Sequence, residues 1–216
     1  ESDYTFADYH SAHGVGQCIM RHDIDVDVDA ALRLARLERQ VNSQMKATYF
    51  VLLTSEFYNV FAKRSLEGLV SIAGLGHELG LHFDETKYPE ASSDSLVDAM
   101  HEEASTLGRA LGIEVKTVSM HMPSKRTLDA NYDLGTLVNS YSARFFREFK
   151  YLSDSKMHWR EDAETIIKSH QYDNLHLLTH AFWYSETPQT APEIMRGFAA
   201  RAQQRTQDNL QVIHPF

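Results

Sequence analysis

The sequence predicts an α/β fold in which a mostly parallel sheet or barrel is covered by helices. Short apolar runs rich in β-branched and aromatic residues alternate with segments of helical spacing, and one run is apolar enough to be buried on both faces. A repeated strand–helix order is typical of parallel sheets. The 216 residues contain no internal repeat, low-complexity linker or break in composition. We therefore expect residues 1–216 to form a single domain.

The N-terminal half contains five predicted elements. Cys18–Asp25 is expected to be a strand, and Asp29 is placed to cap the helix that follows it. The next strand, Ala47–Leu53, is the nearly continuous apolar run. A helix at Ser65–Leu75 and a strand at Glu78–Phe83 follow.

The C-terminal half begins with the clearest amphipathic helix, Asp94–Leu111. Ser92, Ser93 or Asp94 can cap its start, and Gly112 ends it. The remaining elements are a strand at Val115–His121, weaker strand candidates at Ser142–Phe146 and Lys150–Leu152, a helix at Glu161–Lys168, a strand at Leu175–His180 and a last helix at Pro192–Gln204.

Composition excludes several classes of protein. Hydrophobic residues make up 43% of the chain and charged residues 24%, as expected for a globular protein with one sizeable core. The net charge of −9 and the absence of a basic stripe argue against a nucleic-acid binder. No stretch approaches the ~20 apolar residues of a transmembrane segment. The single cysteine, Cys18, allows neither an intramolecular disulfide nor a thiolate cluster, and it favours a reducing, cytoplasmic location.

Four predicted strands end in polar side chains that can bind a metal ion or transfer a proton. Folds of this kind place their ligand sites at the carboxyl ends of the strands. The 12 histidines and the acidic excess are consistent with such a site. The side chains at the four strand ends are Asp23 and Asp25, His82 and Asp84, His121, and His180.

The first strand end carries alternating acids in the run RHDIDVDVD at residues 21–29. Residues two apart in a strand share a face, with Cα atoms ~6.5–7 Å apart. Asp23 and Asp25 can therefore line one cavity, with one of them binding a metal ion and the other acting as a base.

Other interpretations of these acids are weaker. An EF-hand loop starting at Asp23 needs glycine and glutamate where Val28 and Leu34 stand. An aspartyl-phosphate phosphatase also begins with Asp-x-Asp, but the further acidic pair that it needs has no Asp-Asp counterpart here. Helix capping suits Asp29 and Asp27 better than acids inside the apolar run.

The later strand ends supply the other candidates. His82 is a plausible nitrogen ligand for zinc, whereas His77, on the other face, is expected to make a structural hydrogen bond. His180 precedes an aromatic loop in which Trp183 can pack on a sugar and Phe182 can equally cover the core. Asp154 can orient a catalytic group, bind a substrate hydroxyl or serve as a turn residue.

Five segments in this order resemble the polysaccharide deacetylase superfamily, the NodB-homology domain, and more narrowly a branch found with surface-polysaccharide biosynthesis. They are Arg21–Asp25 (RHDID), Ala47–Phe50 (ATYF), Gly76–His82 (GHELGLH), Ser119–Ser124 (SMHMPS) and Leu177–His180 (LLTH), within a resemblance that spans residues 18–184. The resemblance implies a distorted (β/α) barrel of about seven parallel strands with helices outside.

The resemblance also implies roles for individual residues. Asp23 matches the catalytic base, Asp25 the metal-binding aspartate, His82 the first metal-binding histidine and His180 the catalytic acid. The second metal histidine of the family falls at Thr86. The family arginine that orients the base falls nearest to His121. Either His121 acts as the third metal ligand, or the metal is bound weakly or not at all.

These observations predict a metal-dependent hydrolase that removes an N-acyl group from a saccharide or its nucleotide-sugar precursor. The expected cofactor is a divalent ion, most reasonably zinc. The alternative is a re-purposed barrel that binds a sugar or a partner enzyme of polysaccharide assembly, or that catalyses another reaction in the same site. Arg21 is expected to clamp a substrate carboxylate or phosphate, and the further candidates for substrate contact are Asp154, Trp159 and Trp183.

Overall fold

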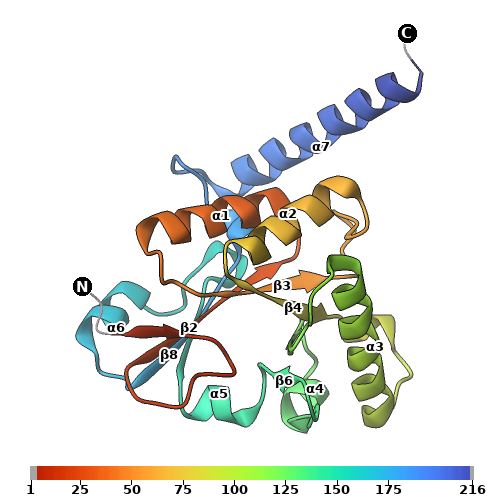
Figure 1. Cartoon of the computed structure of the whole chain (residues 1–216). Coiled ribbons are helices and arrows are strands. Elements are labelled where there is room, and N and C mark those ends of the chain that lie inside the picture. Colours follow the sequence, from red (N-terminus) through yellow and green to blue (C-terminus); the bar gives the residue numbers. More distant parts are fainter. Residues whose placement is uncertain (1–3, 215–216) are drawn as a thin grey trace.

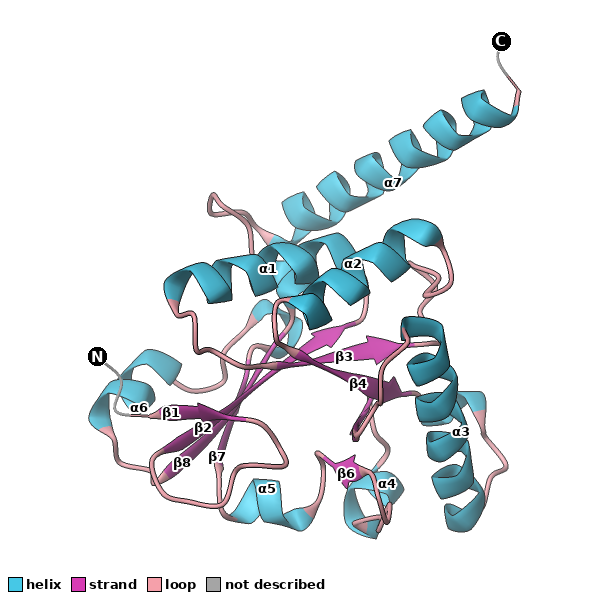
Figure 2. Cartoon of the chain, viewed as in Figure 1, coloured by secondary structure: helices cyan, strands magenta, loops and turns pink. Residues whose placement is uncertain are grey.

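The computed structural model describes residues 4–214, and its centre is a curved sheet of parallel strands (Figures 1 and 2). The strands are β1 (Thr5–Ala7), β2 (Gln17–Ile24), β3 (Thr48–Leu52), β4 (Glu78–Phe83), β5 (Thr117–Met120), β6 (Val138–Asn139), β7 (Lys150–Ser153) and β8 (Asn174–Thr179). Seven of them follow the order β6-β5-β4-β3-β2-β8-β7, and β1 pairs with the start of β2. Within residues 4–214 no pairing joins β6 to β7, so the barrel is open on one side. The predicted distorted (β/α) barrel of about seven parallel strands is confirmed.

Helices surround the sheet, and α7 extends away from the body at the top of Figure 1. Ile194 is its buried residue. No helix in the described part of the chain is long and apolar enough to cross a membrane. The helices are α1 (Val28–Val41), α2 (Lys63–Gly74), α3 (Ser93–Leu111), α4 (Lys125–Ala130), α5 (Ala143–Arg147), α6 (Ala163–Ser169) and α7 (Ala191–Ile213), with 3-10 turns at Glu85–Lys87, Ser155–Met157 and Ala181–Trp183.

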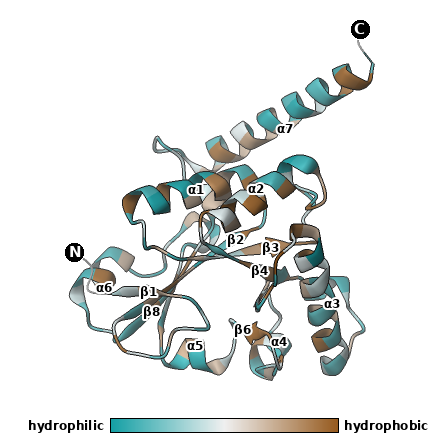
Figure 3. Ribbon diagram, in the orientation of Figure 1, coloured by the Kyte–Doolittle hydropathy of each residue, from teal (hydrophilic) through white to brown (hydrophobic). Residues whose placement is uncertain are grey.

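The main core lies between the sheet and helices α1, α2 and α3. Every residue of β3 is buried, as predicted from its continuous apolar run. Burying one large aliphatic or aromatic side chain contributes about 1.5–3 kcal/mol, so this layer holds the strand ends in place. Figure 3 shows hydrophobic colour along β3 and β4. The buried helix residues that pack here include Ala31, Ala35, Leu69, Ile72, Met100 and Leu107.

Several sequence-based predictions match the structure closely. β4 has the predicted bounds. α3 is capped by the Ser92 hydroxyl, which accepts the Ser95 N–H, and it ends at Gly112 in the left-handed conformation with φ 67°. The weaker strand candidate Lys150–Leu152 is confirmed as β7.

Other predictions need correction. The cap of α1 is Asp27, whose carboxylate accepts the N–H groups of Asp29 and Ala30, and Asp29 instead pairs with Arg64 at 2.8 Å. Ser142–Phe146 is not a strand, because α5 occupies this segment. This one-turn helix buries Phe145 and leaves Phe146 40% exposed. Two adjacent aromatic residues, one buried and one exposed, are compatible with a strand as well as with a helix, so the pair did not distinguish them.

The last helix extends beyond the predicted Gln204 to Ile213. β1, β6 and α4 were not predicted, because segments of two to six residues carry too little periodicity to be recognised.

Candidate metal and acid–base site

Parallel pairing brings four strand ends together. Asp25 follows β2, His82 lies near the end of β4, His121 follows β5, and His180 follows β8. β3 separates β2 from β4, yet the sheet curves so that side chains from both strands meet. The convergence predicted from the sequence is therefore observed.

Asp25, His82 and His121 form a compact group of possible metal ligands. The Asp25 Oδ1 atom lies 3.2 Å from His82 Nε2 and 3.3 Å from His121 Nδ1. The two histidine nitrogens are 3.2 Å apart. Ligands ~2.0–2.1 Å from a tetrahedral zinc ion are about 3.3–3.4 Å apart, so this spacing suits one face of such a site. Three protein ligands also leave a fourth position for water or substrate, as in catalytic zinc sites.

The electrostatics of this group favour a cation. Burial opposes ionisation of Asp25, but hydrogen bonds from His121 and His82 outweigh it and hold the pKa of the carboxyl below its ordinary value. The hydrogen bond to Asp25 raises the pKa of His121. The buried Asp25 Oδ1 atom faces the two imidazole nitrogens at 3.2 and 3.3 Å. An anionic oxygen facing two imidazole nitrogens is a donor set that zinc prefers.

Thr86, at the position of the family's second metal histidine, takes no part in this group. Its hydroxyl donates to Asp84 at 2.7 Å in the 3-10 turn Glu85–Lys87. Of the two interpretations drawn from the sequence, the geometry favours His121 as the third ligand.

Asp23 lies beside the metal group and is bound to Arg21. Its Oδ2 atom is 3.5 Å from His82 Nε2. Arg21 Nη2 donates to both carboxylate oxygens at 2.8 Å, and Nε donates to Oδ1 at 3.2 Å. Burial acts against ionisation of Asp23, but the Arg21 guanidinium outweighs it and lowers the pKa of the carboxyl.

Arg21 is wholly enclosed, so its predicted role as a substrate clamp is wrong. The side chain is 0% exposed and lies against the rings of Phe50 and Tyr141, with 4.8 and 5.3 Å from Cζ to the ring centroids. It also donates to the hydroxyls of Ser119 and Ser140. Arg21 therefore does not face the substrate; it holds the Asp23 carboxylate in place by hydrogen bonds from a buried position.

Gly80 leaves space for the Phe50 ring on which Arg21 stacks. A Cβ on Gly80 would lie 2.6 Å from the Phe50 ring and 2.9 Å from the Thr117 carbonyl oxygen. The absence of a side chain therefore lets β4 lie close to Phe50, on which Arg21 stacks.

His180 is held on the opposite side by Asp154. The Nδ1 atom of His180 is 2.6 Å from Asp154 Oδ1, and the carboxylate also accepts the His180 backbone N–H at 3.0 Å. Tyr184 donates to Asp154 at 3.0 Å. The Nε2 atom is 3.8 Å from Asp25 Oδ2, so this nitrogen faces the metal group.

The ion pair with Asp154 also sets the charge of His180. Burial lowers the pKa of His180, but the hydrogen bond and charge of Asp154 outweigh it and raise the pKa above its ordinary value. Asp154 is 2% exposed. Of the roles left open for Asp154, its contacts favour orienting a catalytic group over binding a substrate hydroxyl.

The two tryptophans lie beside the site. Trp159 and Trp183 line a cavity of about 330 Å³ together with Asp154 and Tyr184. Trp183 packs on Phe182, whose ring lies 5.5 Å from that of Phe198 in α7. The positions are compatible with the predicted substrate contacts of both tryptophans.

His77 makes the structural contact expected of it, since its Nε2 lies 3.3 Å from the Ala35 carbonyl oxygen.

The residues that contact Arg21 and Asp154 and hold them in place were not predicted from the sequence. Ser119 was recoverable in principle, because it lies on β5 two residues before His121, which follows that strand. Ser140 and Tyr141 lie in a turn, Tyr184 follows the 3-10 turn Ala181–Trp183, and none of the three belongs to a sequence pattern.

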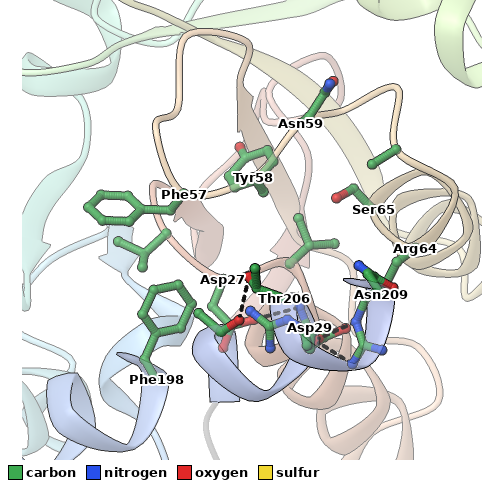
Figure 4. A pocket seen from close by; sticks show the side chains of 15 residues that line it. Asp27, Asp29, Phe57, Tyr58, Asn59, Arg64, Ser65, Phe198, Thr206 and Asn209 are labelled. Carbon is green, nitrogen blue, oxygen red and sulfur yellow. Dashed lines mark hydrogen bonds and ion pairs between the residues drawn. The ribbon is translucent and has the colours of Figure 1, made fainter. Parts of the chain in front are cut away.

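A separate cavity of about 330 Å³ lies between α7 and the first turns of α1 and α2 (Figure 4). Its acidic side chains are already paired: Asp29 with Arg64, and Asp27 with Arg201 at 3.5 Å. It shares no residue with the metal group, so we do not assign it to the site.

Comparison with models of protein families and with curated proteins gives no match. Solved structures do resemble the chain. A mutant of a CE4 family pseudoenzyme with restored enzymatic activity, whose wild-type form is from Bacillus anthracis, has a TM-score of 0.50 and 13% identity. The match covers 88% of this chain and 63% of that one, so this chain spans less than two thirds of the pseudoenzyme.

Two further structures have lower TM-scores. A peptidoglycan deacetylase from Bacillus subtilis has a TM-score of 0.48 and 15% identity, with 94% of this chain and 98% of that chain covered. A family 4 carbohydrate esterase from Streptomyces lividans in complex with acetate has a TM-score of 0.49 and 12% identity, with 88% and 90% covered. At the level of the fold, this similarity agrees with the resemblance found in the sequence: the chain has a barrel like that of the CE4 family pseudoenzyme.

Proposed function

We propose that this protein is a metal-dependent hydrolase that removes an N-acyl group, most simply acetyl, from a sugar or saccharide. The observation that carries the proposal is the arrangement around Asp25, His82 and His121. An ionised carboxylate, Asp23, lies on one side of this group, and an imidazole, His180, lies on the other. Amide hydrolysis needs both a base for water and an acid for the departing amine.

The three ligands fit a zinc ion by spacing and by chemistry. When bound there, zinc would act as a Lewis acid that lowers the pKa of water and stabilises negative charge on the carbonyl oxygen. The carboxylate and two imidazoles would balance much of the charge of a divalent cation.

Asp23 is the group we assign as general base. Arg21 keeps it ionised and fixes both of its oxygens, so that it is ready to accept a proton. A carboxylate fixed in this way loses little orientational freedom when it takes a proton from the attacking water, which is the advantage of a preorganised group. Asp23 is 5% exposed, so few solvent molecules compete for its proton-accepting oxygen.

His180 is the group we assign as general acid. Asp154 accepts from its Nδ1 and raises its pKa, which leaves Nε2 as the nitrogen that carries a proton towards the site. Protonation of the departing amine there prevents the tetrahedral intermediate from reverting to the amide. Such a proton transfer contributes typically 10²–10⁴-fold in rate.

The surroundings of the catalytic groups support a saccharide as the proposed substrate class. Trp159 and Trp183 offer apolar ring faces beside it, as expected for a saccharide. One similar structure is that of a peptidoglycan deacetylase. The proposal also includes a nucleotide sugar as an alternative substrate, partner enzymes of polysaccharide assembly and a cytoplasmic location.

Release of free amine and acetate from N-acetylated saccharides tests the function. We expect turnover by the zinc-loaded protein, none after chelation, and recovery when zinc is returned. His101→Ala, on α3, is a control that keeps activity. A protein that binds zinc and saccharides but releases no acetate under any metal supports the alternative of a re-purposed binding barrel.

A further inference from the structure

We propose that His22 is a positioning residue: its hydrogen bonds on the face of the sheet covered by α1 fix the strand ends that carry Asp23 and His180. This inference rests on the proposed function, because it concerns the same base and acid. His22 lies between Arg21 and Asp23 on β2 and is 1% exposed. Since successive side chains of a strand point to opposite faces, its imidazole faces away from the metal group.

The His22 imidazole connects α1 to the end of β8. Its Nε2 donates to the Glu38 carboxylate of α1 at 2.7 Å, and its Nδ1 forms a hydrogen bond of 2.6 Å with the Thr179 hydroxyl. Thr179 is the last residue of β8 and directly precedes His180. The ring therefore joins the strand that carries the base to the residue beside the acid.

This connection lies where the backbone pairing of β2 with β8 ends. The final pair of that ladder is His22 with Thr179. Asp23 pairs with Phe50 on β3, but among the described residues it has no backbone partner on β8. The hydrogen bond between the two side chains thus strengthens the pairing immediately before the strands reach Asp23 and His180.

Glu38 is held firmly enough to act as the anchor of this connection. Its Oε1 accepts from His22, its Oε2 accepts from the Tyr49 hydroxyl at 2.7 Å, and Oε2 is also 3.8 Å from His77 Nδ1. Burial opposes ionisation of Glu38, but the charge interaction and hydrogen bonds with these partners outweigh it and lower the pKa of the carboxyl. A buried carboxylate costs free energy that an apolar side chain would avoid, so its directional hydrogen bonds explain its presence under α1.

Precise placement of the two strand ends matters because proton transfer depends on small distances. A displacement of ~1 Å caused by a change far from the reacting atoms can lower a rate by ~10²-fold. Asp154 fixes the His180 ring, whereas His22 acts on the residue that precedes His180 in the chain. Loss of the His22 contact should therefore displace the acid without removing its carboxylate partner.

Thr179→Val and Thr179→Ser test this inference. Valine keeps the shape of threonine but lacks the hydroxyl that binds His22, whereas serine retains it. With zinc-loaded protein and an N-acetylated saccharide, Thr179→Val should lower kcat by about 3- to 10-fold and leave KM within about 2-fold, and Thr179→Ser should restore kcat to within about 2-fold of the wild type.

Thr48→Val is the matched control. Thr48 is also a buried strand threonine, 1% exposed, and its hydroxyl donates to Glu78 at 2.8 Å at the start of β3. The variant loses a comparable hydrogen bond at the amino end of the sheet, so it should be less stable but keep the kcat of the wild type. An equal fall of kcat in Thr48→Val and Thr179→Val would reduce the effect to general stability and overturn the inference.

A spectroscopic measurement separates this inference from the hydrolase proposal. In isotopically labelled, chelated protein, the ring N–H that His180 donates to Asp154 should give a resonance, because the hydrogen bond slows its exchange with water. We expect this resonance to shift or broaden in Thr179→Val and to stay unchanged in Thr48→Val. That result supports the inference even if no saccharide is hydrolysed.

Turnover decides the inference where the protein is active, and the His180 resonance decides it where no saccharide is hydrolysed. A folded Thr179→Val variant with the wild-type kcat overturns the inference and leaves the hydrolase intact, and so does a failure of Thr179→Ser to restore kcat. In an inactive protein, a His180 resonance that is unchanged in Thr179→Val overturns it. If Thr179→Val does not fold, Glu38→Gln takes its place in both measurements, with the same expected and contradicting results, because it removes the charge that holds His22.

Discussion

Arg21 and Asp23 stand two positions apart on β2, and the guanidinium donates three hydrogen bonds to the carboxylate while both side chains are buried. The family resemblance places an arginine that orients the base near His121, on another strand. In this chain β2 carries both the base and the cation that orients it. Because Arg21 orients the base from β2, position 121 can hold a histidine, which belongs to the metal group with Asp25 and His82.

The Arg21–Asp23 pair is predicted to contribute strongly to stability. In Arg21→Gln the buried Asp23 carboxylate loses its cation, and removal of one partner of a buried pair costs about 3–5 kcal/mol. We expect the free energy of unfolding in urea to fall by about this amount. The double variant Arg21→Gln/Asp23→Asn should regain much of it, because no buried charge is then left unpaired. A single variant as stable as the wild type would show that the pair is solvated.

The ion pair with Asp154 should set the upper pH limit of activity. Because Asp154 raises the pKa of His180, Asp154→Asn lowers that pKa and leaves less of the protonated acid at a given pH. The alkaline limb of the kcat profile is therefore expected to move to lower pH, whereas the acidic limb stays. An alkaline limb that does not move would assign it to another group.

His180 is expected to act in catalysis without holding the metal. His180→Ala should lower kcat by about 10²–10⁴-fold, the usual contribution of a general acid. The zinc content of the variant should equal that of the wild type, since its Nε2 is 3.8 Å from the nearer Asp25 oxygen. Full activity in this variant would remove the acid role.

His176 predicts a specific dependence of stability on pH. Burial among aromatic rings lowers the pKa of His176 to about 3. Below pH 6.5 the unfolded chain gains a proton there that the folded chain does not, so the free energy of unfolding decreases as the pH falls. The contribution is about 1.4 kcal/mol per pH unit between pH 6 and 4.

His176→Phe provides the comparison for this prediction. The variant leaves the Tyr9 hydroxyl, now 2.7 Å from His176 Nε2, without its partner, so its baseline stability is lower. The informative quantity is the slope of unfolding free energy with pH, which should be shallower than that of the wild type. Equal slopes would mean that His176 is protonated in the folded protein.

The sequence was sufficient to predict elements with strong periodicity and the convergence of strand ends. β4, α3 and the run of β3 follow from hydrophobic pattern and capping alone. Because the strands pair in parallel, Asp25, His82 and His121 all lie at the carboxyl-end edge of the sheet. These features depend on hydrophobic pattern, on helix capping and on the parallel pairing of the strands.

The role of Arg21 could not be predicted, because it depends on what covers the side chain. A charged residue at the end of an apolar run is as compatible with an exposed clamp as with a buried support. Tyr141, Ser119 and Phe50, which come from three other segments, enclose it, and no pattern around position 21 reports their approach. The same reasoning applies to Asp154, whose partner His180 is 26 positions away.

The most direct test of the account is the zinc content of dialysed protein, measured by atomic emission for the wild type and for single alanine variants. We predict about one zinc ion per wild-type chain, loss of the ion in Asp25→Ala, His82→Ala and His121→Ala, and retention in Thr86→Ala. A wild-type protein that takes up no zinc at neutral pH, or a His121→Ala variant that holds it as tightly as the wild type, would contradict the proposed metal site.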